Sequence, residues 1–326
     1  MTDLLSPSTP HHSSSAAHPA DLSFELLGEV RGWRDGIELP LGAPRQRALL
    51  AVLLLRAGSP VGRDYLIDGI WGDSTVLDGA NLVQAYVSKL RKLFEPDRRP
   101  RTAGGVLTRV GASYRLSIGL QQCDLGRFEQ SVADARALWD AGQLDAAERT
   151  LAAALSQWPG PALTGVTGPL LDVERTRLAE LRLAVVEEHT ELALELGGHA
   201  RLVPHLLVLT AEHPYRERLW ALLMAALYRG SRQADALAAY QRARHALMEN
   251  LGLLPGPELR GVEEAILARR PDPFARVTTP AEGPGRATEP RHPHLTLVGP
   301  APLATPSAPH STTRGPGSAG ATRLAR

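Results

Sequence analysis

The stretch Ala80-Asn-Leu-Val-Gln-Ala-Tyr-Val-Ser-Lys-Leu-Arg-Lys-Leu-Phe94 decides the fold, together with two short apolar runs that follow it. At about 100° per residue, one side of this helix collects its large apolar side chains: Val83, Tyr86, Val87, Leu90, Leu93 and Phe94. The other side collects Asn81, Gln84, Ala85, Ser88, Arg91 and Lys92, with Lys89 at its edge. The stretch therefore predicts an amphipathic helix with a polar, basic outer face.

Two predicted strands follow this helix. The runs Val-Leu-Thr-Arg-Val110 and Tyr-Arg-Leu-Ser-Ile118 flank a Gly-Ala-Ser turn, and each carries one arginine, Arg109 or Arg115. A basic helix closed by such a hairpin is typical of a winged helix-turn-helix that places its helix in a DNA groove. A basic amphipathic helix is also common as an ordinary solvated helix, so the prediction depends on the elements around it.

The elements before the basic helix supply that context. Residues 22–40 are predicted to form short strands around an Arg34-Asp-Gly36 turn, because Asp-Gly between apolar runs is a strong hairpin signal. A first helix is predicted from Pro44 to about Arg56, and a second from about residue 63 to 71. Strands, three helices and a terminal hairpin are the element order of an OmpR-type winged helix.

The second half of the chain is predicted to be entirely helical. Apolar residues recur at three- and four-residue spacing in segments at about 124–140, 143–157, 170–196, 198–212, 214–229, 231–250 and 256–269. One pair of these helices matches the spacing of a tetratricopeptide repeat through Trp220, Leu223, Leu227, Ala236, Tyr240 and Ala243. An ordinary helical bundle is the alternative.

Length and charge agree with two domains plus tails. Residues 22–120 hold 14 Arg and Lys against 10 Asp and Glu, whereas residues 121–270 hold 16 against 20. Lys89 and Lys92 are the only lysines of the 326 residues, and both lie in the predicted basic helix. The basic surplus therefore lies with the predicted DNA-reading helix, and the acidic helical half suits a protein partner.

The remaining composition excludes several classes of protein. Cys123 is the only cysteine, so no intrachain disulfide, cysteine-based zinc site or iron–sulfur cluster is expected. The sequence shows no signal peptide and no apolar run of about 18 residues, which predicts a cytoplasmic protein without a membrane segment. Residues 1–20 consist mostly of Ser, Thr, Pro, His and Ala, and residues 271–326 hold 11 of the 26 prolines. Both segments are therefore predicted to be disordered tails.

Several motifs carry a resemblance to a known family. Arg45-Gln-Arg-Ala-Leu-Leu-Ala-Val-Leu-Leu-Leu55, Ile70-Trp-Gly-Asp73, Val87-Ser-Lys-Leu-Arg-Lys92 and Tyr114-Arg-Leu116 resemble the OmpR-type winged helix. Cys123-Asp-Leu-Gly-Arg-Phe-Glu129, Ala211-Glu-His-Pro-Tyr-Arg-Glu-Arg-Leu219 and Leu251-Gly-Leu-Leu-Pro-Gly-Pro-Glu-Leu259 resemble the bacterial transcriptional activation domain. In this order, over about residues 22–270, they resemble the AfsR/SARP family, the Streptomyces antibiotic regulatory proteins.

The resemblance implies a fold and a division of the chain. It implies a mainly α protein, in which an α+β winged helix-turn-helix precedes an all-α, tetratricopeptide-like domain. The expected boundaries are a tail at 1–20, a winged helix at 21–119, an activation domain at 120–270 and a Pro-rich tail at 271–326.

The resemblance also implies a function. A sequence-specific activator is expected, which binds direct repeats in promoters of a secondary-metabolite gene cluster, self-associates on tandem sites and recruits RNA polymerase through its sigma and alpha subunits. Such a protein acts in the cytoplasm, associated with the nucleoid when bound to DNA. No cofactor or metal is expected.

The expected DNA contacts combine the helix and the hairpin. Gln84 and Arg91 suit base edges, because glutamine pairs with adenine and arginine with guanine, and Ser88 and Lys92 share their face. Lys89 and the two hairpin arginines, Arg109 and Arg115, suit phosphates or the minor groove: they complete the predicted set of seven.

The sequence departs from the family pattern at several points. The hairpin at 106–118 is the wing of the winged helix. Ser113 stands where a glycine usually precedes its tyrosine, Tyr114, which predicts a bulged turn or an altered wing tip. Leu254 replaces a commonly acidic residue, with no consequence that we can derive. Larger family members add an ATPase module, whose phosphate-loop motif is absent here, so the chain resembles the short form.

The sequence fits other classes of function less well. No Gly-x-Ser-x-Gly or His-Glu-x-x-His motif occurs, so an enzyme is not expected. The main alternative is a tetratricopeptide-type adaptor whose winged helix does not bind DNA. A response-regulator output domain is disfavoured, because about 20 residues precede the predicted winged helix.

Overall fold

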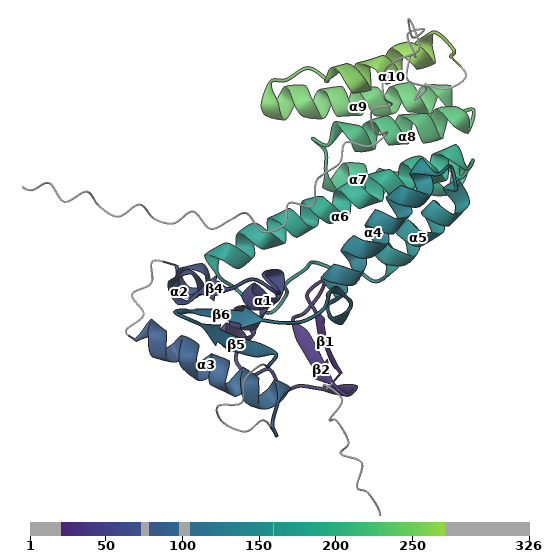
Figure 1. Ribbon diagram of the computed structural model, residues 1–326. Helices are drawn as coiled ribbons and strands as arrows, with labels where there is room; N and C mark the ends of the chain where they lie inside the picture. The colour runs from purple at the N-terminus through teal and green to yellow at the C-terminus, as the bar shows by residue number, and fades with distance from the viewer. Residues whose placement is uncertain (1–20, 73–77, 98–104, 159, 271–326) are drawn as a thin grey trace, which may run out of the picture. The chain divides into compact units, whose positions relative to one another are not determined.

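The computed structural model describes residues 21–72, 78–97, 105–158 and 160–270, drawn as the coloured ribbon in Figure 1. The two tails that the sequence predicts to be disordered, 1–20 and 271–326, lie outside the described residues, as does most of the loop at 72–79. The described part is mainly helical, with two three-stranded sheets in its N-terminal section. The predicted fold class is therefore confirmed.

The first sheet is an antiparallel meander at the start of the chain. Its strands are β1 (Leu22–Glu25), β2 (Arg31–Arg34) and β3 (Ile37–Glu38), in that order. Asp35 and Gly36 form the tight turn with φ of 52° and 76°. A two-residue turn of type I′ requires positive φ at both turn positions, which explains why Asp-Gly is found there.

The winged helix is completed by three helices and a second sheet. The helices are α1 (Pro44–Leu55), α2 (Arg63–Trp71) and α3 (Gly79–Phe94). The second sheet has the order β4-β6-β5, with strands β4 (Val61–Gly62), β5 (Leu107–Val110) and β6 (Ser113–Leu116). Most of α1 is buried, since it contacts α2, α3, α6 and β6.

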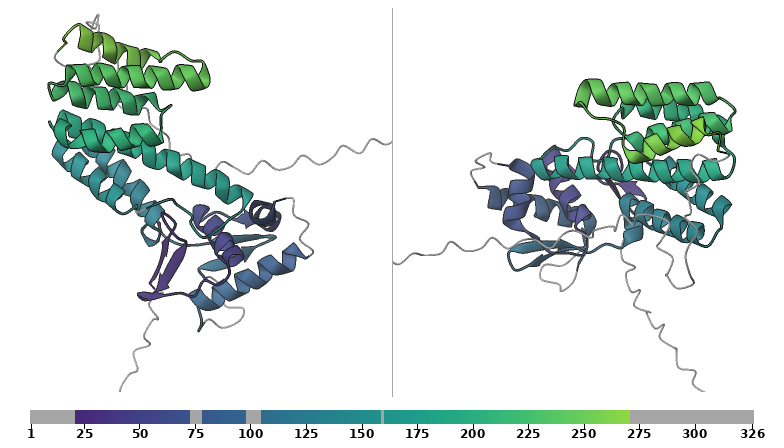
Figure 2. Two further views of the ribbon diagram at one scale, coloured as in Figure 1. Left: turned by 180° about the vertical axis from the view of Figure 1, so that it is seen from behind. Right: turned by 90° about the horizontal axis from the view of Figure 1, so that it is seen from above.

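The helical half follows directly. It consists of η1 (Leu120–Gln122), α4 (Asp124–Asp140), α5 (Leu144–Ser156), α6 (Pro169–Glu195), α7 (His199–Glu212), α8 (Glu217–Arg229), α9 (Gln233–Leu251) and α10 (Pro257–Leu267). Helices α8, α9 and α10 contact one another and lie side by side in every view (Figure 2). The predicted tetratricopeptide pair corresponds to α8 and α9, and all six signature residues are buried between the helices.

The hydrophobic core does not divide at the predicted domain boundary. One buried cluster contains the apolar residues of the winged helix together with those of α4, α5 and part of α6. A second cluster combines other residues of α6 with α7, α8, α9 and α10. The boundary at 119/120 stays a prediction, and the packing shows that a cut there would open the first core.

Asp124 links the two halves of the chain at the first turn of α4. It is 8% exposed, and its carboxylate accepts hydrogen bonds from the backbone N–H groups of Leu26, Leu27 and Leu125 at 2.8, 2.9 and 2.7 Å. Leu26 and Leu27 directly follow β1, so one carboxylate satisfies buried donors of the N-terminal sheet and of the helical half.

The start of α6 packs against α2 at very short range. Leu170 lies against Gly69, and Pro169 against Gly72. Gly168 has a φ of 154°, and a Cβ built on it would lie 2.7 Å from the carbonyl oxygen of Gly69. Glycine is therefore required at position 168 for both its conformation and its lack of a side chain.

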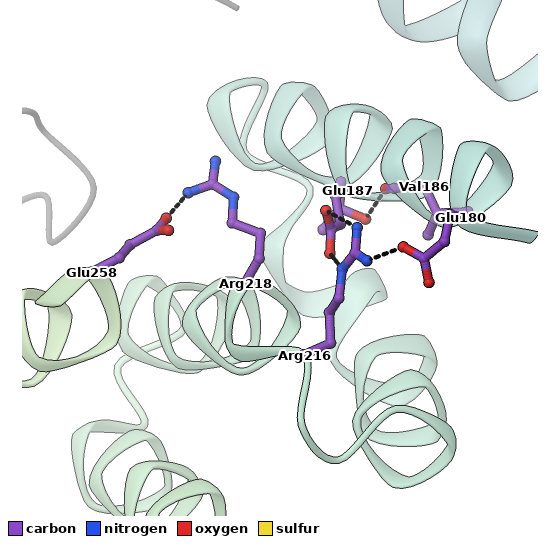
Figure 3. A network of polar contacts seen from close by, with 7 residues as sticks. Glu180, Val186, Glu187, Arg216, Arg218 and Glu258 are labelled. Carbon is purple, nitrogen blue, oxygen red and sulfur yellow. Dashed lines mark hydrogen bonds and ion pairs between the residues drawn. The ribbon is translucent and has the colours of Figure 1, made fainter. Parts of the chain in front are cut away.

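Arginines on and just before α8 connect it to its neighbours (Figure 3). Arg216 is turned toward Glu180 and Glu187 of α6, and its Nε lies 2.8 Å from Glu187 Oε1. Arg218 pairs with Glu191 of α6 and with Glu258 of α10. The Arg-Glu-Arg piece of the family motif therefore serves the packing of the helical half.

Candidate nucleic-acid interface

Helix α3 forms for the reason that the sequence predicts. Val83, Val87, Leu90 and Phe94 recur at three- and four-residue spacing and are buried to 1% exposure or less. Phe94 meets Phe24 of β1 edge to face, with ring centroids 5.5 Å apart. This apolar side fixes α3 to the core, and the opposite side faces away from it.

The exposed side of α3 carries most of the predicted contact residues. Gln84, Ser88 and Lys92 are exposed at four-residue spacing and therefore form one stripe along the helix. Lys89 is exposed beside it. The ion pairs within the described residues are made by arginines and one histidine, and neither lysine takes part in one.

Arg91 lies differently from its predicted neighbours. It is only partly exposed, and its Nε donates a 2.8 Å hydrogen bond to the carbonyl oxygen of Leu107 in β5. The helical period alone put it on the outer face, because the period does not reveal that a wing strand runs beside the end of α3. The structure thus brings Gln84, Ser88 and Lys92 together and turns Arg91 toward the wing.

The two wing arginines point to opposite faces of the hairpin. Arg109 is opposite Tyr114 in the register and Arg115 is opposite Thr108, so the two side chains alternate across the sheet. Arg109 is exposed near the turn, where its Nε donates to the carbonyl oxygen of Gly111 at 2.9 Å. Arg115 is half-buried, and its buried Nε has no hydrogen-bond partner in the described part of the chain.

The wing turn corrects one expectation from the sequence. Ser113 is a strand residue that pairs with Val110, and the pairing between β5 and β6 continues without a bulge from Leu107 to Val110. Gly111 takes the positive φ, 59°, that the tight turn needs, so no second glycine is required at position 113. Of the two outcomes expected from Ser113, a bulged turn or an altered wing tip, the bulged turn is therefore wrong.

Sequence reasoning missed two residues at the end of α3. Arg34 of β2 donates from its Nη1 to the carbonyl oxygen of Leu93 at 3.2 Å. Glu95 accepts a 3.3 Å hydrogen bond from the backbone N–H of Val106. Neither contact has a local sequence signal, since 59 residues separate Arg34 from Leu93.

The described residues include no group of three or more His, Cys, Asp or Glu side chains that could hold a metal ion. Burial, reinforced by the neighbouring Asp124 carboxylate, raises the pKa of the Cys123 thiol to about 12, so the reactive thiolate is scarce at neutral pH. Within the same residues, no helix has the length and apolar character that crossing a membrane requires.

Known families match both halves of the chain. Residues 38–116 match the family described as transcriptional regulatory protein, C terminal, and residues 123–267 match the bacterial transcriptional activator domain. The fold is similar to that of the solved structure of Mycobacterium tuberculosis EmbR in complex with a low affinity phosphopeptide. The two chains superpose with a TM-score of 0.73 and are 38% identical in sequence. That similarity covers 77% of this chain and 66% of the EmbR chain.

Curated relatives agree with the domain matches. The regulatory protein AfsR of Streptomyces coelicolor is 42% identical over 77% of this chain, and the regulatory protein DnrI of Streptomyces peucetius is 33% identical over 77%. The similarity covers 93% of DnrI, but the chain spans only about a quarter of the length of the AfsR proteins that it matches. Both domain descriptions and the names of these relatives describe regulators. The chain belongs to the AfsR/SARP family of transcriptional regulators, with an OmpR-type winged helix followed by a bacterial transcriptional activator domain.

Proposed function

We propose that this regulator is a sequence-specific activator that reads promoter DNA with α3 and its wing. The observation that carries the proposal is the exposed stripe of Gln84, Ser88 and Lys92 on a helix whose other side is fully packed. A glutamine amide can pair with an adenine edge in the major groove. The exposed Lys89 and Arg109 suit phosphate or minor-groove contacts, and Arg115 joins them if its guanidinium turns outward.

Two substitutions test which contacts read sequence. Gln84→Ala should weaken binding to the cognate duplex by about 1–3 kcal/mol and relax preference at one base pair, because it removes a base contact. Lys89→Ala should weaken cognate and random duplexes alike and lower the salt slope by about one, because it removes a phosphate contact. Fluorescence anisotropy across a salt series measures both effects.

Ala85→Ser supplies the matched control for these variants. Residue 85 is exposed on the same helix but carries only a methyl group, so both affinities should stay within about twofold of the original. If Gln84→Ala also left the cognate preference unchanged, the proposed reading role of Gln84 would be wrong.

Activation is assigned to the helical half and rests on the family. Its acidic surplus, 20 Asp and Glu against 16 Arg and Lys in residues 121–270, suits a basic surface of RNA polymerase or a second protomer on a tandem site. We propose that sigma and alpha subunits are the polymerase contacts, and that the protein works in the cytoplasm on the nucleoid. Reconstituted transcription with and without the protein measures this step.

The target is proposed to be a secondary-metabolite gene cluster that includes this gene. This rests on membership of a family that contains AfsR and DnrI. Transcripts of the flanking genes, compared between the original strain and a deletion strain, decide the point: unchanged biosynthetic transcripts would reject the pathway while leaving DNA binding untouched. The alternative is a tetratricopeptide-type adaptor whose winged helix does not bind DNA. It predicts equal affinity for promoter and random duplexes.

A further inference from the structure

Polar contacts gather around the last turn of α3 and join it to two other elements. The last carbonyls of a helix lack partners within the helix and carry partial negative charge. Arg34 of β2 donates to one of them, on Leu93, at 3.2 Å. Arg91 and Glu95 tie the same turn to the start of the wing, through Leu107 at 2.8 Å and Val106 at 3.3 Å.

These contacts hold the helix end against both the N-terminal sheet and the wing. Beneath them the Phe24–Phe94 ring contact gives the same turn an apolar anchor on β1. Base reading tolerates little misplacement, because a bidentate contact to a base edge is directional and its side chain has to be held within about half an ångström. A device that fixes the end of α3 therefore has a direct use in DNA recognition.

We propose that Arg34 and Arg91 are positioning residues, which fix the reading helix relative to the N-terminal sheet and to the wing so that helix and wing reach DNA in one register. The inference rests on the proposed function, since it explains how that function becomes specific. It gives Arg91 a different role from the base contact that the sequence predicts. It also gives the N-terminal sheet, which lies outside the helix-turn-helix itself, a part in specificity.

Arg34 offers the cleaner test, because a matched arginine lies on the same strand. Arg31 is also on β2, but it pairs with Glu38 at 2.7 Å and stacks over Trp33 at 5.0 Å, and no bond from it to α3 is seen in the described residues. Arg34→Met and Arg31→Met each remove one positive charge from β2 and keep a long side chain. Each variant also loses one ion pair, since Arg34 pairs with Asp35 at 3.6 Å as Arg31 pairs with Glu38, so a difference between them reports the contact with α3.

The experiment measures affinity of the full chain for duplexes from its own upstream region and for shuffled duplexes at one salt concentration. Arg34→Met should lower the cognate-to-shuffled affinity ratio about tenfold, whereas Arg31→Met should leave the ratio unchanged. Arg34→Lys should restore part of the ratio, because an ammonium group can still donate to the Leu93 carbonyl. A change confined to the folded fraction would lower both affinities equally and leave the ratio intact.

Two results would overturn the proposal while sparing the proposed function. One is an unchanged ratio in Arg34→Met, and the other is an equal loss on both duplexes with a smaller salt slope, which would make Arg34 a phosphate contact. Hydrogen exchange of the free protein provides a readout that does not depend on DNA. Backbone amides in the last turn of α3 should exchange several-fold faster in Arg34→Met than in Arg31→Met. Equal exchange rates would reject the positioning contact, whether or not the protein prefers its cognate duplex.

Discussion

Replacing Asp124 by alanine is expected to destabilise the chain by about 3–5 kcal/mol, which is a large share of the stability of an ordinary domain. The carboxylate accepts three backbone N–H groups, and two of the donors, on Leu26 and Leu27, belong to residues that are 0% and 1% exposed. Alanine leaves those donors buried without acceptors, and water does not reach them to compensate. Urea unfolding monitored by circular dichroism measures the change.

Two comparison variants define what this result means. Asp134→Ala removes an exposed carboxylate from the same helix, whose contact is the Gln130 side chain at 2.8 Å, so its effect should stay below about 0.5 kcal/mol. Asp124→Asn keeps the shape but turns one acceptor into a donor, so it should lose at least half as much stability as alanine. An Asp124→Ala protein as stable as Asp134→Ala would show that the joint between β1 and α4 is not held in this way.

Replacing Gly168 by alanine is expected to cost about 2–5 kcal/mol, because two penalties combine. The added Cβ would lie 2.7 Å from the Gly69 carbonyl oxygen and 3.0 Å from the Cα and carbonyl oxygen of Ile70. These are backbone atoms, which cannot rotate aside as a side chain does. The φ of 154° adds conformational strain for any residue with a side chain.

The matched glycine for this test has the opposite expectation. Gly261 lies within α10, and a Cβ there would meet no atom within 4 Å. Gly261→Ala should therefore stabilise the chain by up to about 1 kcal/mol, because alanine favours the helix. Differential scanning calorimetry on both variants gives the two signs in one experiment, and a neutral Gly168→Ala would refute the close packing of α6 on α2.

Local periodicity was enough to predict the helices and the two faces of α3. The bounds of α2 and α4 agree with the sequence prediction at both ends, since Gly, Pro and polar residues punctuate the chain there. The buried and exposed positions of α3 follow from a 100° rotation per residue, with Arg91 as the informative exception. The stripe of Gln84, Ser88 and Lys92 was therefore predictable from the sequence.

Contacts between distant segments were beyond sequence reasoning. The two-residue strand β4 is too short to show a period, and its pairing with β6 joins segments about fifty residues apart. The bond from Arg34 to Leu93 and those from Leu26 and Leu27 to Asp124 depend on packing between elements that only the folded chain brings together. For the same reason the sequence did not reveal that one hydrophobic core continues past residue 120.

The central claim, that α3 and the wing read promoter DNA, is tested most directly by hydroxyl-radical footprinting of the full chain on the DNA upstream of its neighbouring genes. The account predicts protection of two repeats in the same orientation, with centres about 10–11 base pairs or a multiple apart, as tandem protomers on one face of the duplex require. It also predicts that Gln84→Ala weakens this protection more than Ala85→Ser does. If the protein bound every duplex but protected no site, even at saturating concentration, the result would contradict the claim that α3 and the wing read promoter DNA.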